Sequence, residues 1–157
     1  MSYKTVRELF EHVGRWQKRV EEFCEDVADR SANDRTSAMM NYFAGHEREL
    51  GRILNEYPKT ERAGVLDTWI QHTSEDDVRT FFQKADLDPD QPLDEATATV
   101  VEFDDRLRDM YRTLSESSQV PPRVQAVFQN LLEAQEWQTL RNSWSASDSE
   151  QYSEGVA

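Results

Sequence analysis

The sequence predicts an all-α protein, and three observations carry that prediction. Apolar residues recur at steps of three and four along four long segments, which is the spacing of one buried helix face. The chain of 157 residues contains only five Gly and five Pro, whereas an all-β fold needs a turn signal every few residues. A chain of this length also fits one domain with a core large enough to fold unaided.

The boundaries of the four helices follow from their apolar periodicity and from the residues that interrupt it. Cap-forming residues at 31–34 separate the first two helices, Pro58 is expected to end the second, and Pro121-Pro122 begins the fourth. The short link between the first two predicts an antiparallel hairpin. We therefore expect one helical-bundle domain over residues 1–144, with helices at about 5–30, 34–57, 93–115 and 121–144.

Residues 58–92 are expected to form a long crossover that contains short helices. The apolar residues at 66–70 suggest one of them, and a cap at Ser74 predicts another, which carries Val78, Phe81 and Phe82. The aromatic cluster of the crossover consists of Trp69, Phe81 and Phe82. It either forms a lid on the bundle or makes a dimer contact.

Three aspartates in the crossover alternate as they do at the start of an EF-hand calcium loop. They are Asp86, Asp88 and Asp90. The sixth position of that loop is Gln91 where glycine is required, and the twelfth is Thr97 where glutamate is required. We therefore interpret the segment as an acidic, helix-capping turn.

Composition and charge exclude several classes of partner. The formal net charge is −13, which repels nucleic acid and anionic membranes. No apolar run approaches the roughly 18 residues of a membrane span, and the N-terminus lacks the pattern of a signal peptide. Because Cys24 is the single cysteine, no disulfide within the chain is expected, and we expect a cytoplasmic protein. The polar, acidic tail at 145–157 is expected to be disordered.

One motif in the second helix carries a resemblance to a known family. The stretch from Tyr42 to Leu50 reads YFAGHEREL. It resembles the aromatic-Ala-x-x-Glu-x-x-His signature of rubrerythrins and their ferritin-like relatives, in which Glu and His one turn apart bind a di-iron centre. Glu47 falls at the carboxylate position, and Leu50 falls at the histidine position.

The fourth helix is similar to a second copy of this signature, with Gln135 at the carboxylate position and Gln138 at the histidine position. The family's spacing assigns Glu102 as the bridging carboxylate of the third helix. In the first helix, Gly14 stands at the position where the family's spacing places a ligand. The resemblance therefore implies a ferritin-like four-helix bundle of two antiparallel hairpins joined by the long crossover. It also implies that the di-iron site is degenerate, because a di-iron centre needs several carboxylates and usually two imidazoles.

The remaining polar candidates lie on apolar helix faces. His46 is interpreted either as a metal ligand or general base, or as a histidine at the edge of the core. Helical periodicity also turns Gln17, Gln135 and Gln138 inward, and we predict that these amides and His46 form a buried, hydrogen-bonded polar layer. Cys24, surrounded by acidic residues, is interpreted as a small buried apolar residue.

Two functional hypotheses follow. The first is a non-catalytic ferritin-like protein, without catalytic residues, cofactor or metal, that acts in protein interaction or assembly as a homodimer. The alternative is an atypical metal-binding or redox enzyme of the same fold, and its ligands are expected to be His46, Glu47 and Glu102. No nucleophile motif, phosphate loop or zinc-protease sequence is present in the chain.

The excess of acidic residues predicts how stability depends on salt. The chain has 31 Asp and Glu residues against 18 Lys and Arg, and salt screens their repulsion over about 10 Å at an ionic strength of about 0.1 M. We expect the melting temperature, measured by circular dichroism, to rise as NaCl increases from near zero to a few hundred millimolar. A flat or falling curve would show that charge repulsion does not limit stability.

Overall fold

The computed structural model describes residues 3–60, 64–71 and 75–136 and confirms that the protein is mostly helical. Its elements, in chain order, are β1 (Tyr3–Thr5), α1 (Val6–Arg30), α2 (Asp34–Thr60), β2 (Trp69–Gln71), α3 (Glu75–Lys84) and α4 (Leu93–Glu116). A further helix covers residues 122–136, and we call it the 122–136 helix. Gln138 and the tail at 145–157 lie outside the described residues. Among the described residues, no helix combines the length and apolar composition that crossing a bilayer requires.

Helices α1 and α2 form the expected antiparallel hairpin, and a capping residue marks the N-terminal end of each helix. The hydroxyl of Thr5 accepts a hydrogen bond from the backbone N–H of Glu8 at the start of α1. The side-chain oxygen of Asn33 accepts from two N–H groups of the first turn of α2, those of Arg35 and Thr36, at 2.9 and 3.2 Å. These bonds satisfy N–H groups that have no partner within the helix.

Helix α2 extends past Pro58, which was expected to end it, and stops at Thr60. The prediction was wrong by three residues, because a proline removes only one backbone N–H donor from the helix. In a last turn that loss removes one hydrogen bond and disturbs only the end of the helix. Helix α4 begins at Leu93 and ends at Glu116, close to the predicted 93–115.

The crossover contains a strand where a short helix was expected. β2 pairs antiparallel with β1, with Ile70 opposite Lys4. The carbonyls of Leu66 and Thr68 accept hydrogen bonds from the backbone N–H groups of Arg7 and Val6, at 2.9 and 3.1 Å. The segment forms a turn and a strand because its carbonyl groups bond to N–H groups at the start of α1, which lies far away in the sequence.

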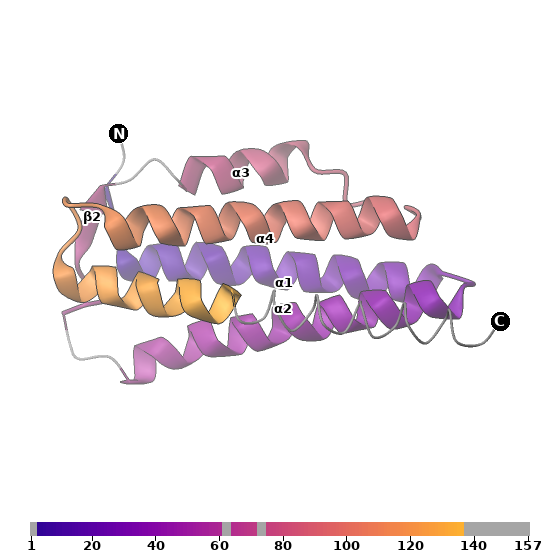
Figure 1. The fold of residues 1–157 in the computed structure, drawn as a ribbon, viewed down its shortest axis with the longest axis horizontal. Helices are drawn as coiled ribbons and strands as arrows, with labels where there is room; N and C mark the ends of the chain where they lie inside the picture. Colours follow the sequence, from indigo (N-terminus) through magenta and orange to yellow (C-terminus); the bar gives the residue numbers. More distant parts are fainter. Residues whose placement is uncertain (1–2, 61–63, 72–74, 137–157) are drawn as a thin grey trace.

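Helix α3 lies along α4 and buries the crossover's two phenylalanines (Figure 1). The ring of Phe82 stacks on Trp16 of α1 with centroids 6.0 Å apart, and it meets Phe103 of α4 edge-on at 5.4 Å. Phe81 also contacts Phe103. These two side chains therefore cover the long helices, whereas Trp69 is 63% exposed.

The aspartate turn before α4 uses its carboxylates on its own backbone. Asp86 accepts a hydrogen bond from the N–H of Asp88, and Asp88 accepts one from the N–H of Asp90. Asp90 also lies 3.6 Å from the guanidinium of Arg30. These contacts account for the alternate spacing of the three residues in terms of turn formation.

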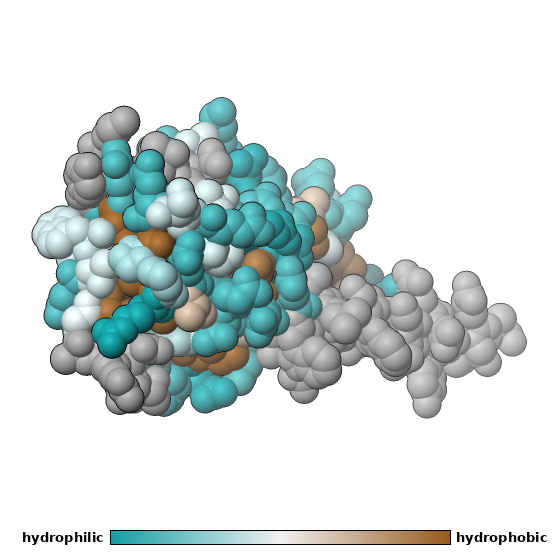
Figure 2. All heavy atoms as spheres, turned by 60° about the vertical axis from the view of Figure 1, so that its left-hand side comes forward, coloured by the Kyte–Doolittle hydropathy of each residue, from teal (hydrophilic) through white to brown (hydrophobic). Residues whose placement is uncertain are grey.

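The core lies between α1, α2, α4 and the 122–136 helix, which run alongside one another in Figure 1. Phe128 joins three of them, because its ring contacts Phe10 of α1 at 6.2 Å and Tyr111 of α4 at 6.1 Å. The side of the molecule nearest β2 is mainly hydrophilic, with apolar residues in small separate areas (Figure 2). Among the described residues the large apolar side chains that remain exposed are Tyr42, Trp69 and Val101.

The homodimer remains a prediction, and Trp69 is the residue with which to test it. An exposed tryptophan on a short two-stranded sheet is a typical contact residue. We expect a dimer mass by light scattering at tens of micromolar, and a shift toward the monomer mass in Trp69→Ser. The matched control is Val101→Ser, which alters an exposed apolar residue of α4. A monomer mass for the unaltered chain would contradict the prediction.

Candidate metal centre

Three buried side chains that bind metals in many proteins meet between α2 and α4. His46 and Glu47 lie on α2, and Asp104 lies on α4. The Nε2 atom of His46 is 3.3 Å from Oδ2 of Asp104 and 3.9 Å from Oε1 of Glu47. One ligand atom from each residue lies within 4.8 Å of the other two. We call these residues the His46–Glu47–Asp104 cluster.

Helix α2 can bury two consecutive polar residues because its buried face is wide. One set of buried positions passes through Met40, Ala44 and Glu47, and a second passes through His46 and Leu50. The helix packs against α1 on one side and contacts α4 on another, so adjacent residues both reach the interior. A helix on the surface of a protein has a narrower buried stripe.

Asp104, and not Glu102, is the acidic residue that α4 brings to the cluster. Glu102 is exposed, and its carboxylate pairs with the guanidinium of Arg106 at 3.1 Å. Two residues correspond to about 200° around a helix, so Glu102 and Asp104 face nearly opposite directions. Sequence reasoning missed Asp104, although it stands four residues after Val100 and three before Leu107, both in the apolar stripe.

The cluster concentrates negative charge where there is little water. The pKa of Glu47 lies well above its ordinary value, because its carboxyl group is buried, because Asp104 is negatively charged, and because protonated Glu47 donates a hydrogen bond to Asp104. Glu21 adds a smaller effect of the same sign. Glu47 therefore keeps its proton to a higher pH than an ordinary glutamate does.

The negative charges of the cluster also act on Cys24 of α1. Burial is the largest cause that raises the pKa of its thiol, and the negative charges of Glu47 and Asp104 raise it further. A thiol with a raised pKa is neither a good nucleophile nor a ready metal ligand. Burial also raises the pKa of the Tyr111 hydroxyl. Neither group offers a reactive anion beside the cluster.

Two of the amides that were expected to face inward are buried. Gln17 of α1 is 3% exposed, and Gln135 of the 122–136 helix is fully buried. The Oε1 atom of Gln17 accepts no hydrogen bond from the described residues. That these amides bond to His46 in one polar layer remains a prediction.

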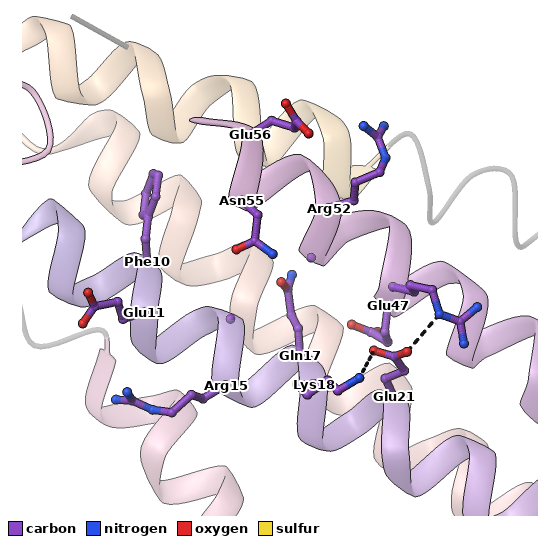
Figure 3. A pocket seen from close by; sticks show the side chains of 13 residues that line it. Phe10, Glu11, Arg15, Gln17, Lys18, Glu21, Glu47, Arg52, Asn55 and Glu56 are labelled. Atoms are coloured by element: carbon purple, nitrogen blue, oxygen red, sulfur yellow. Dashed lines mark hydrogen bonds and ion pairs between the residues drawn. The ribbon is translucent and has the colours of Figure 1, made fainter. Parts of the chain in front are cut away.

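A groove between α1 and α2 reaches the edge of the cluster (Figure 3). It has a volume of about 660 Å³, and Gln17 and Glu47 point into it. Glu21, which also lines the groove, is held by Arg48 at 2.9 Å and by Lys18 at 3.6 Å. Glu47 is thus shared between the groove and the cluster.

The chemistry of the cluster fits one divalent transition-metal ion. An imidazole nitrogen and carboxylate oxygens are ligands that suit Zn²⁺, Fe²⁺ and Mn²⁺. Ligands about 2.0–2.2 Å from one such ion lie about 3–3.5 Å from each other. The 3.3 Å separation between His46 and Asp104 agrees with that spacing, and the 3.9 Å separation between His46 and Glu47 is slightly longer.

Comparison with known proteins adds no relative: no protein-family model, no curated protein and no solved structure matches this chain.

The raised pKa of Glu47 predicts how the stability of the metal-free protein depends on pH. The pKa of Glu47 in the unfolded chain is 4.5, and below that pH its contribution to stability is fully present. This contribution is lost as pH rises through the higher pKa of Glu47 in the folded protein. Glu47→Gln stays neutral, so its stability relative to the parent chain should increase by about 1.4 kcal/mol per pH unit across that window.

Urea unfolding in the presence of a chelator, at about pH 5 and about pH 8, measures this difference. Glu22→Gln, which alters an exposed acid of α1, is the control and should show little change between the two pH values. If Glu47→Gln shifted stability equally at both, Glu47 would be ionised throughout.

Proposed function

We propose that this chain is a ferritin-like four-helix bundle that binds a single divalent transition-metal ion through His46, Glu47 and Asp104. The observation that carries the proposal is the burial of a histidine and two carboxyl groups within 4.8 Å of one another. Two buried carboxyl groups in contact are unfavourable unless a proton or a cation lies between them. A dication balances both carboxylates and leaves the histidine neutral.

A single ion is favoured over a pair because the second half of the family's site lacks its ligands. Leu50 and Gln135 stand at two of the expected ligand positions, and neither side chain supplies charge. Glu21, a further carboxylate whose charge acts on Glu47, is already bonded to Arg48. Two dications need more carboxylates than this interior provides.

The competing proposal is an interaction bundle that has lost its metal and acts in assembly. It is supported by the missing ligands and by the exposed Trp69. It assigns a structural role to the cluster, in which Glu47 stays neutral beside Asp104 and no metal ion binds. The two proposals therefore differ in one measurable property, the affinity of the cluster for a metal ion.

We expect the chelator-treated chain to bind about one Mn²⁺, Fe²⁺ or Zn²⁺ per molecule, as measured by elemental analysis after dialysis, and to melt at a higher temperature when metal is added. Asp104→Asn should weaken binding by about tenfold or more. Glu102→Gln, the matched control on the exposed side of the same helix, should leave it unchanged. Affinity should fall as pH falls, because protons compete for the ligands.

Two results would reject the metal proposal. The first is less than a tenth of an equivalent of metal bound at micromolar concentrations, and the second is equal loss of affinity in Asp104→Asn and Glu102→Gln. The first result would favour the interaction bundle.

A further inference from the structure

A metal site that is buried in a bundle needs a route by which the ion reaches it. The side chain of Glu47 is 0% exposed and that of His46 is 2% exposed, so solvent does not touch the carboxyl group of Glu47 directly. Of the three cluster residues, Glu47 also lines the groove between α1 and α2. The groove therefore leads from the surface of the protein to the edge of the cluster.

The antiparallel pairing of α1 and α2 sets the direction of the groove. Gly51 of α2 faces Gln17 of α1, because a Cβ atom at Gly51 would lie 3.7 Å from Oε1 of Gln17. Glu21 and Glu47 each lie one helical turn from this pair, toward the connection at residues 31–33. The groove thus passes between the glycine and the amide and ends at two carboxyl groups (Figure 3).

Glu21 stands between solvent and Glu47. Its side chain is 9% exposed, and its negative charge is one of the causes that raise the pKa of Glu47. Its carboxylate lies 2.9 Å from Nε of Arg48 and 3.6 Å from Nζ of Lys18. A dication that approached along the groove would meet Glu21 first and would compete with these two side chains for its oxygens.

The ion pairs of Glu21 are of a kind that opens readily. The side chains of Arg48 and Lys18 are 61% and 63% exposed, and ion pairs with exposed partners are weak. Arg48 also bonds to Glu25 at 2.7 Å, and the Glu25 side chain is 41% exposed. The guanidinium group can therefore leave Glu21 and keep an acidic partner.

We propose that the groove is the entry route of the metal ion, that Glu21 is the carboxylate that receives the ion first, and that the Arg48–Glu21 ion pair controls its passage to Glu47. This rests on the proposed function, because it supplies the path to the cluster. The groove is lined by four acidic and four basic residues. Because these charges balance, the groove itself does not retain an ion, and the ion moves on to the cluster.

Stopped-flow absorption with Co²⁺ tests the route, because the visible spectrum of Co²⁺ changes when protein ligands bind it. Mixing the chelator-treated full chain with Co²⁺ measures entry, and mixing the loaded protein with excess EDTA measures exit. Gly51→Leu narrows the groove beside Gln17 and leaves the cluster residues unaltered. We expect it to slow entry and exit alike, by about tenfold, with an unchanged dissociation constant, since a barrier on the path affects both directions equally.

Two further glycine variants accompany this measurement. Gly45→Leu is the matched control on the same helix, where a Cβ atom meets no atom within 4 Å, and it should change neither rate. Gly51→Ala places a Cβ at an ordinary contact distance and should slow both rates by a smaller factor. The alanine variant keeps the test decisive if the leucine variant fails to fold.

A pair of arginine variants tests the control of passage. Arg48→Gln frees Glu21 from its closest cation and should raise both rates by about threefold or more. Arg52→Gln is the matched control, because it also lines the groove and changes the net charge equally but pairs with the exposed Glu49. It should change both rates by less than about twofold.

An equilibrium titration with Co²⁺, made first, separates the two proposals. If no metal binds, both the metal site and its route are rejected. If metal binds and Gly51→Leu and Gly51→Ala leave both rates unchanged, the metal site stands and the groove is not its route. The ion would then approach from the side of Asp104, whose side chain is 13% exposed. Equal effects of Arg48→Gln and Arg52→Gln would reject control by the Arg48–Glu21 pair.

Discussion

The antiparallel pairing of α1 with α2 is the contact on which both the cluster and the groove depend. The turn between them is short and held by side chains, among them Ser37, whose hydroxyl donates to the carbonyl of Ala28 at 2.7 Å. Because this turn fixes the alignment of the two helices, residues in the middle of α1 face residues in the middle of α2. Gln17 therefore lies opposite Gly51, and Glu21 reaches Arg48.

The energetic problem of this interior is the burial of acidic residues. Glu47 and Asp104 lie beside one another where water cannot solvate both charges, and a buried carboxylate without compensation is strongly unfavourable. Two features compensate for this burial: the pKa of Glu47 is raised, which favours its neutral form, and the imidazole of His46 lies 3.3 Å from Asp104. A divalent cation is a third, and it would use the same atoms. Placing the two acids together is thus costly for an empty bundle and useful for one that binds a metal.

The crossover has a composition typical of a loop, yet it packs against the long helices and contributes to the core. Its carbonyls bond to N–H groups at the start of α1, and Phe82 fills the space between Trp16 and Phe103. Phe82 of α3 thereby covers Trp16 of α1, whereas the groove between α1 and α2 is left open.

The long helices could be predicted from the sequence because their evidence is local. Apolar residues at steps of three and four mark a buried face, and caps such as Asn33 mark an end, without reference to any distant segment. The inward placement of Gln17, His46 and Gln135 was inferred in the same way, and all three are buried. Helical periodicity is thus enough to determine which face of a helix is buried.

Other features depend on segments far apart in the chain, and only the tertiary structure decided them. The strand at Trp69 exists because β1 lies beside it, and nothing within residues 66–70 specifies that partner. Asp104 was not predicted, because an aspartate is usually a surface residue and nothing in its own helix indicates that His46 and Glu47 of α2 lie opposite it. A residue's own helix determines the direction in which it points, but the packing of two helices determines what it meets.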